Sequence, residues 1–417
     1  MLYAMRQTVS LKKQYQIVDD LLVQRIHKLL PELMEETGYD MWIILCREYN
    51  EDPVFTTMLP SLCLTARRLS CLVFVKQGER FEALNFGRPS EHLNRVYTQG
   101  YTDSSRDQLE MLAEYVRKVE PQRIGINCSP INAMCDGLSK SMYDKLYQAL
   151  DPQDRDKLCS AYPLAVRWIE TRTQEELSRY RTVYQLAMEI CEEAFSRKVI
   201  TPGVTTTTEV EEWIAQEINR LGLTFWFSPH VDVQRQGLDG VGSEGELIQH
   251  GDLLHYDVGI KYFGLCSDSQ RLGYVLRENE TEVPAYLQEA FAKTSRFQDI
   301  VSQEHITGRT GNEILKTCLE RAQQEGIAAM LYCHPIGYFG HSAGTVVGLW
   351  DMQQGIGEYG DFPLHKNTCY ALELNTESCL KEWGGQRVRF SAEETVAFTE
   401  DGKLSYLYPG REKIYAI

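Results

Sequence analysis

The first 150 residues alternate between two spacings of apolar positions. Apolar residues recur at helical spacing over three segments, residues 18–36, 107–119 and 137–149. Short continuous apolar runs, which are typical of buried strands, occupy residues 41–46, 71–75, 81–86 and 123–127. This alternation predicts an α/β domain.

A second domain is predicted beyond a polar stretch at residues 170–177, so we place the boundary near residues 168–172. Two amphipathic helices open this domain; Thr206 and Glu209 form a capping box at the start of the second, and Gly222 ends it. Four strand-like segments follow, with two helices between them: strands 252–260, 263–276, 368–375 and 386–399, and helices at about 283–303 and 310–325.

The predicted architecture therefore has two parts. Residues 1–168 form an α/β N-terminal domain, and residues 169–417 form an α+β domain. Because strands predominate in the second part and helices are interposed, we expect its sheet to be curved and mostly antiparallel.

Composition narrows the class of protein. The 417 residues are 43% hydrophobic and 24% charged, as in a folded globular chain. A formal net charge of −16 repels nucleic acid and anionic lipid surfaces. The sequence shows neither a signal peptide nor an apolar stretch of membrane-spanning length, and its 12 cysteines lie mostly in apolar runs. We therefore expect a cytoplasmic protein that binds neither nucleic acid nor membranes.

Carboxylates inside strand-like runs are the main chemical signal. A hairpin that reverses at residues 262–263 would place Asp257 directly opposite Asp268. Glu373 and Glu393 lie in two further strand-like runs, although glutamate is disfavoured in strand interiors. The alternative is that both aspartates cap turns. Four carboxylates that meet would repel one another unless a cation neutralises them, so the pattern predicts a metal site.

His341, in the segment GYFGHSAG (337–344), adds one nitrogen donor to these four carboxylates. Carboxylate and imidazole ligands suit hard to borderline divalent cations. This number of ligands predicts two ions, about 3.5–4 Å apart, that can share a hydroxide.

With these residues the sequence resembles the creatinase/prolidase/aminopeptidase P metallopeptidases, over nearly the whole chain. In that family two metal ions are held by an Asp, a second Asp eleven residues later, a His in a Gly-His segment, and two strand glutamates. The matching residues here are Asp257, Asp268, His341, Glu373 and Glu393. A Thr-Glu-Asp-Gly turn at residues 399–402 follows the last of them, and Glu394 is the rival for that position.

The resemblance implies a pita-bread catalytic domain behind a creatinase-like N-terminal domain, and a homodimer. It implies two divalent ions, Mn2+ first, with Co2+, Fe2+ or Zn2+ as alternatives. The implied reaction is hydrolysis of the N-terminal peptide bond of Xaa-Pro type peptides. Glu373 would bind metal and shuttle the proton, while His334 or His230 would stabilise the oxyanion.

Some positions depart from the family pattern. Members that cleave beside proline usually carry a His four residues before the metal-binding His and another about seven after it. Counted from His341, these positions are Gly337 and Gly348, and no His lies about seventeen residues before Asp257. The function therefore stays open between an aminopeptidase for Xaa-Pro peptides and two alternatives. One alternative is a metal-dependent dipeptidase or amide hydrolase that acts on a non-proline or non-peptide substrate. The other is a catalytically silent binding module.

Overall fold

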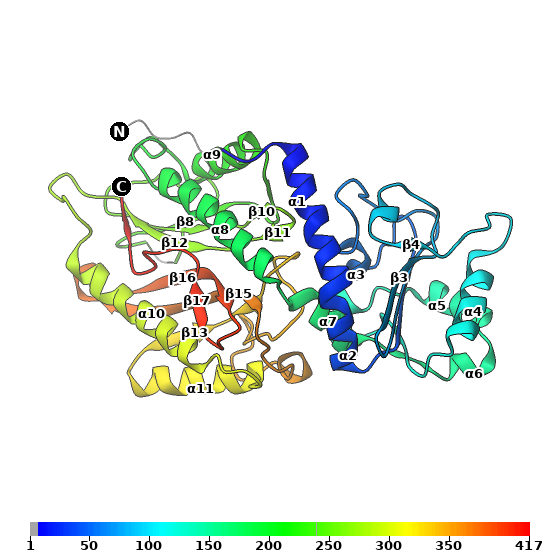
Figure 1. The fold of residues 1–417 in the computed structure, drawn as a ribbon. Helices are drawn as coiled ribbons and strands as arrows, with labels where there is room; N and C mark the ends of the chain where they lie inside the picture. Colours follow the sequence, from blue (N-terminus) through cyan, green and yellow to red (C-terminus); the bar gives the residue numbers. More distant parts are fainter. Residues whose placement is uncertain (1–6, 239) are drawn as a thin grey trace. The chain divides into compact units, whose positions relative to one another are not determined.

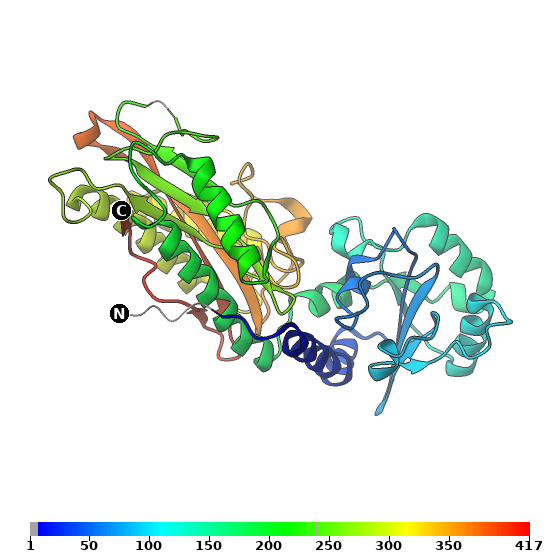
Figure 2. The same cartoon turned by 90° about the horizontal axis from the view of Figure 1, so that it is seen from above.

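The computed structural model describes residues 7–238 and 240–417, and the chain forms two compact units (Figures 1 and 2). One unit is Val9–Thr173; the other is Gln174–Ile417 together with residues 7 and 8. Across the described residues, none of the helices combines the length and the apolar composition of a membrane-spanning segment. The prediction that the chain opens without a signal peptide bears in part on residues 1–6, which lie outside the described range.

The N-terminal unit contains a six-stranded mixed sheet in the order β4-β3-β2-β1-β5-β6. Its strands are β1 (Met41–Cys46), β2 (Ser70–Gln77), β3 (Arg80–Asn85), β4 (Thr98–Gln99), β5 (Ile124–Ile126) and β6 (Leu158–Ser160). Its helices are α1 (Leu11–Gln24), α2 (Leu30–Thr37), α3 (Pro53–Thr56), α4 (Gln108–Val119), α5 (Lys140–Ala149), α6 (Pro152–Arg155) and α7 (Tyr162–Glu170). Every residue of β1 is buried, and alternate ones form a core with α4 and α5. The predicted α/β unit is confirmed.

The C-terminal unit is built on a nine-stranded sheet with the central order β13-β15-β16-β12-β9-β8. Its strands are β8 (His230–Gln234), β9 (Leu253–Asp257), β12 (Gln270–Tyr274), β13 (Ala328–Leu331), β14 (His334–Pro335), β15 (Thr368–Leu380), β16 (Gln386–Phe398), β17 (Leu404–Tyr406) and β18 (Tyr415–Ala416). Among its described pairings only β12 with β18 is parallel, as expected for a mostly antiparallel sheet. A small sheet joins β7 (Thr224–Phe225), β10 (Ile260–Tyr262) and β11 (Leu265–Cys266).

Four helices accompany this sheet: α8 (Gln174–Ala194), α9 (Thr207–Arg220), α10 (Ala285–Glu304) and α11 (Gly311–Gln324). The predicted capping box of α9 is confirmed, with both of its hydrogen bonds present between Thr206 and Glu209. Figure 1 shows α10 and α11 side by side along β13 and β15. Leu372 and Leu374 of β15 belong to the core that these helices share with the sheet. Since side chains alternate along a strand, Glu373 between them points to the other face.

The predicted hairpin register differs from the structure by two residues. The turn is at Phe263 and Gly264, whose φ angles of 53° and 78° are the positive values that a tight two-residue turn requires. Asp257 is therefore opposite Gln270, and the expectation that it faces Asp268 directly was wrong. A shift of two residues keeps each side chain on its own face of the sheet, so the two aspartates can still approach each other.

Candidate metal centre

One row of residues crosses five strands of the large sheet. The strand registers pair His230 with Asp257, and Asp257 with Gln270. They then pair Gln270 with Glu393, and Glu393 with Glu373. Directly opposed residues on neighbouring strands share a face. The sheet therefore gathers three of the four predicted carboxylates, with His230 and Gln270, along one line.

Asp268 and His334 join this row from outside it. His334 begins β14, where it is paired with Ala371 of β15. Its Nε2 lies 3.8 Å from Oδ2 of Asp268, 3.9 Å from Oε2 of Glu373 and 3.9 Å from Oε1 of Glu393. Donor atoms about 2.0–2.2 Å from a shared ion lie within about 4.4 Å of one another. The spacing therefore fits an ion held between His334 and these carboxylates.

His341 lies beside this cluster and not among the carboxylates. Its side chain is exposed, and its ring packs edge-on against the ring of His334, with centroids 4.6 Å apart. The structure therefore brings His334 to the position that the sequence analysis gave to His341. Counted from His334, His341 stands seven residues later, where proline-cleaving members of the family usually have a His, and Met330 stands four residues earlier.

Burial raises the pKa of all four carboxyl groups. Desolvation comes first, and the charges of Asp257 and Glu373 then add to it, so the pKa of Asp268 lies well above its ordinary value. The pKa of Glu393 is raised well above its ordinary value by desolvation and then by the neighbouring carboxylates. Desolvation and then Asp257 raise the pKa of Glu373 to about 8. Desolvation also raises the pKa of Asp257, although His255 and His230 oppose it. A cation would relieve this repulsion.

Several buried polar atoms of the cluster have no hydrogen-bond partner among the described residues. They are Nε2 of His334 and both carboxylate oxygens of Glu393. Buried polar atoms are nearly always satisfied, by protein, water or an ion. Carboxylates with an imidazole suit divalent ions such as Mn2+, Fe2+, Co2+ and Zn2+. The residues present therefore fit a divalent metal centre.

Glu394, the rival for the last position, faces away from the cluster. Its Oε2 accepts hydrogen bonds of 2.8 Å from Nη2 of Arg271 and 2.8 Å from the hydroxyl of Tyr184. The same Arg271 donates through Nη1 to the backbone carbonyl of Glu393 at 2.8 Å. Because neighbouring residues of a strand point to opposite faces, this buried ion pair supports β16 from behind while Glu393 faces the cluster.

Three polar residues at the site were not predicted: Asp232, His255 and Gln270. They form hydrogen bonds to one another and to Glu373. The available signal was a set of polar residues at alternate positions in apolar strands, since residues 230, 232, 255 and 257 share one face. Strand β8, which supplies Asp232, was itself not predicted.

A cleft of about 540 Å³ adjoins the cluster, and of the four carboxylates Glu373 is the one that lines it. His334, His341 and Glu373 line it. The rest of the lining is largely aromatic and aliphatic: Tyr332, Ser342, Val346, Leu349, Trp350, Asp351 and Tyr359.

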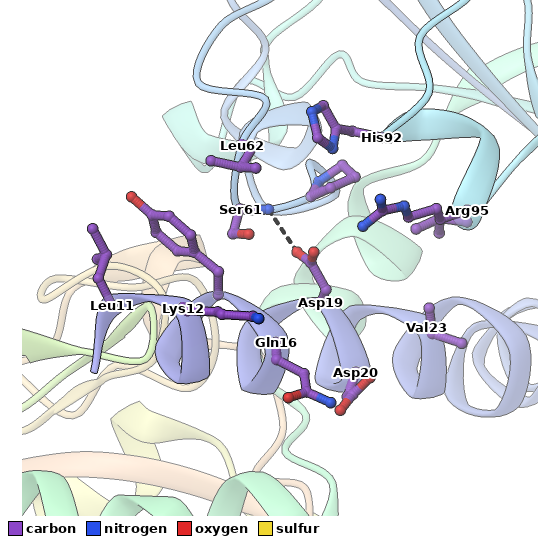
Figure 3. Close-up of a pocket in the computed structure, with 13 residues that line it drawn as sticks. Leu11, Lys12, Gln16, Asp19, Asp20, Val23, Ser61, Leu62, His92 and Arg95 are labelled. Carbon is purple, nitrogen blue, oxygen red and sulfur yellow. Dashed lines mark hydrogen bonds between the residues drawn. The ribbon is translucent and has the colours of Figure 1, made fainter. Parts of the chain in front are cut away.

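A separate cavity of about 660 Å³ lies within the N-terminal unit, between α1 and residues 60–62 and 92–96 (Figure 3). Figure 3 shows Asp19 turned toward Ser61, whose backbone N–H donates to Oδ1 of Asp19 at 2.7 Å. Its lining mixes apolar and charged side chains and shares no residue with the carboxylate cluster. This cavity is therefore separate from the candidate metal centre.

Carboxylates and a histidine gathered by a sheet beside a cleft are the arrangement that metal-dependent hydrolases use. Residues 178–400, more than half of the chain, match the sequence model of metallopeptidase family M24. The chain belongs to this family, and the predicted resemblance to the creatinase/prolidase group is confirmed. No curated protein matches the sequence.

Solved structures with low sequence identity share the fold. The X-Pro aminopeptidase from Thermotoga maritima MSB8 has a TM-score of 0.66 at 15% identity, over 93% of this chain and 100% of that chain. The Xaa-Pro dipeptidase from Bacillus anthracis has a TM-score of 0.64 at 17% identity, over 96% and 100% of the two chains. The N-terminal domain of the FACT complex subunit SPT16 from chickpea (Cicer arietinum) has a TM-score of 0.58 at 10% identity, over 94% and 98%. The predicted pita-bread fold is confirmed.

Proposed function

We propose that this protein is a dinuclear metal-dependent aminopeptidase that hydrolyses the N-terminal peptide bond of Xaa-Pro type peptides. One observation carries the proposal: Nε2 of His334 faces the carboxylates of Asp268, Glu373 and Glu393, with Asp257 beside them, next to a cleft of about 540 Å³. The substrate class is supported by the fold shared with an X-Pro aminopeptidase and an Xaa-Pro dipeptidase.

The proposed metal ligands are Asp257, Asp268, Glu373, Glu393 and His334. His334 takes the place first given to His341, because its Nε2 faces three of the carboxylates. The number of carboxylates supports two ions. Mn2+ is the first candidate from the family resemblance, and Co2+, Fe2+ or Zn2+ suit the same ligands.

The residues around the cluster can perform the remaining chemistry. When bound, the ions would polarise the scissile carbonyl and activate a water molecule. Glu373 lines the cleft, so its carboxylate would take the proton of the attacking water and pass it to the leaving amine. His341 also lines the cleft, and burial lowers its pKa, so its neutral ring would donate a hydrogen bond to the carbonyl oxygen.

His230 is the second candidate for stabilising the oxyanion. It is paired with Asp257 at the end of the row, and its ring lies 3.4 Å from Glu211 and 3.6 Å from Asp232. Its side chain is half exposed and therefore accessible to a substrate. Replacing His230 with Ala should lower turnover; unchanged turnover would remove it from the mechanism.

The substrate proposal is tested with matched peptides. The Mn2+-loaded protein is incubated with Xaa-Pro dipeptides, Xaa-Pro-Xaa tripeptides, the same peptides with Ala in place of Pro, and small amides. We expect release of the N-terminal residue from the proline peptides, lost on chelation and in the Asp268→Ala variant. Preferred cleavage of the alanine peptides or the amides would replace the Xaa-Pro assignment with the dipeptidase or amide hydrolase alternative. No cleavage of any substrate by metal-loaded protein would favour a binding module.

A further inference from the structure

Gln270 occupies the centre of the row and connects two strands through its side chain. It is 4% exposed, so its amide relies on the protein for hydrogen bonds. Nε2 of Gln270 donates to Oε1 of Glu373 at 2.5 Å. The Oε1 atom of the same amide lies 3.0 Å from Nε2 of His255. Gln270 thus links a proposed metal ligand to a histidine on the neighbouring strand.

Asp232 forms a hydrogen bond with the other ring nitrogen of His255. Its Oδ2 atom lies 2.9 Å from Nδ1 of His255, and the two residues are paired directly across β8 and β9. Both side chains are buried. Asp232, His255, Gln270 and Glu373 therefore form one continuous series of hydrogen bonds, here called the support chain.

The chemistry of these groups allows the Gln270 amide only one orientation. A carboxylate that binds metal is ionised, so it accepts hydrogen bonds and cannot donate, and in the metal-bound protein Glu373 requires the NH2 end of the amide. The oxygen end then faces Nε2 of His255, and the protonated ring of His255 donates through Nε2 to Gln270 and through Nδ1 to Asp232. A reversed amide would set two acceptors against each other at Glu373. The support chain therefore fixes the Gln270 side chain from both ends.

This arrangement determines which oxygen of Glu373 is available at the centre. Its Oε1 is engaged by Gln270, and its Oε2 is the atom that lies 3.9 Å from Nε2 of His334. We propose that Gln270, held by His255 and Asp232, is a positioning residue that turns Oε2 of Glu373 toward the metal centre and so sets its metal affinity. The inference rests on the proposed function, because it takes Glu373 to be a metal ligand.

The test measures metal binding, with Mn2+ titrated into chelator-stripped protein by calorimetry and Co2+ absorption spectra recorded for each variant. Gln270→Leu removes the amide and is expected to weaken Mn2+ binding by about 10–100-fold, the range for loss of a partner that orients a ligand. The absorption bands of bound Co2+ should also shift, because the orientation of Glu373 changes.

A second variant tests whether Asp232 acts through Gln270. Asp232→Asn should weaken Mn2+ binding by a smaller factor. The double variant Asp232→Asn with Gln270→Leu should bind Mn2+ as Gln270→Leu does, because residues acting in series are not additive.

Gln234→Leu is the matched control. Gln234 is a buried glutamine of β8 whose amide bonds the backbone of Arg389 at both ends and takes no part in the support chain. This variant should leave Mn2+ affinity and the Co2+ spectrum unchanged.

The outcomes separate this inference from the proposed function. If the parent protein binds Mn2+, and the Gln270→Leu variant binds it with equal affinity and an unchanged Co2+ spectrum, this inference is overturned and the proposed function is not. Additive losses in the double variant would overturn the role of Asp232. A parent protein that binds neither Mn2+ nor Co2+ would overturn both proposals. If Gln270→Leu does not fold, Asp232→Asn, which preserves the side-chain shape, decides the question, and unchanged affinity there would overturn the inference.

Discussion

His334 and His341 belong to one short segment but have different surroundings. His334 is buried, and its Nε2 faces the carboxylates of Asp268, Glu373 and Glu393. His341 is exposed next to the cleft, and its ring contacts the ring of His334. These surroundings support the proposal that His334 binds metal and His341 contacts the substrate.

Replacing these two histidines should separate metal binding from turnover. We expect His334→Ala to lose most bound Mn2+, because the proposed centre loses its nitrogen ligand. His341→Ala should keep the metal content of the parent while kcat falls by about 100-fold, the effect of losing one oxyanion donor. Metal content by elemental mass spectrometry and steady-state kinetics on the same preparations check both results. Normal metal content in His334→Ala would return the ligand role to His341.

The sequence identified Asp257, Asp268, Glu373 and Glu393 because carboxylates are conspicuous inside apolar strands. It gave the nitrogen ligand as His341, because only the pairing of β14 with β15, which the sequence does not show, places His334 at the carboxylates. The support chain was missed because Asp232, His255 and Gln270 come from three strands whose register is set by a turn. The positive φ of Phe263, a non-glycine residue, moved that turn by one residue.

At the scale of elements, β16 is held between the cluster on one face and a buried ion pair on the other. Glu393 faces the proposed metal centre, whereas Glu394 pairs with Arg271 of β12 and Tyr184 of α8. Arg271 and Glu394 are both almost fully buried. This pair connects a helix and two strands directly behind the ligand.

Removing one partner of this pair should destabilise the fold. Glu394→Leu leaves the Arg271 charge buried without its partner, which typically costs about 3–5 kcal/mol. The control is Glu377→Leu, because Glu377 pairs across β15 and β16 with an exposed arginine, Arg387, and such a pair contributes about 0–1 kcal/mol. Chemical denaturation measures both free energies of unfolding. Equal effects in the two variants would contradict the supporting role of the Arg271 pair.

Helices and long strands were predicted well because their patterns are long. The predicted helices at 283–303 and 310–325 correspond to α10 and α11, and the predicted strand at 386–399 corresponds to β16. The predicted strand at 263–276 is in fact β11 and β12, interrupted at residues 267–269 where Asp268 approaches Thr395. Contacts between segments far apart in the sequence produce such a break, and the local spacing of apolar residues cannot predict those contacts.

At the scale of the whole molecule, the carboxylate cluster makes the free energy of unfolding depend on pH and on metal binding. The pKa of Glu373 in the folded, metal-free chain is about 8, far above the unfolded value of about 4. The folded state therefore binds protons that the unfolded state has released, so the free energy of unfolding should fall as pH rises from about 4 to about 8. Bound cations favour the ionised carboxylates, so this loss should disappear.

Thermal unfolding across this range tests the linkage. In chelator, the melting temperature should fall between about pH 6.5 and about pH 8. Burial lowers the pKa of His305, a histidine of the same unit, to about 4, so this residue is neutral throughout the window and does not alter the pH dependence of stability. With excess Mn2+ the melting temperature should stay level over the same window, because the carboxylates are then ionised in both the folded and the unfolded state. Glu393→Gln, which lacks one of the raised carboxyl groups, should show a weaker fall in chelator. Parallel curves with and without Mn2+ would contradict the linkage.

The central claim is that the five proposed ligands hold two metal ions per chain. The most direct measurement is metal content per chain by elemental mass spectrometry after dialysis against Mn2+, for the parent and for Asp268→Ala. The account predicts about two ions per chain in the parent, as in two-metal hydrolases, and a clear loss in the variant. No metal in the parent, or the same content in both proteins, would contradict it.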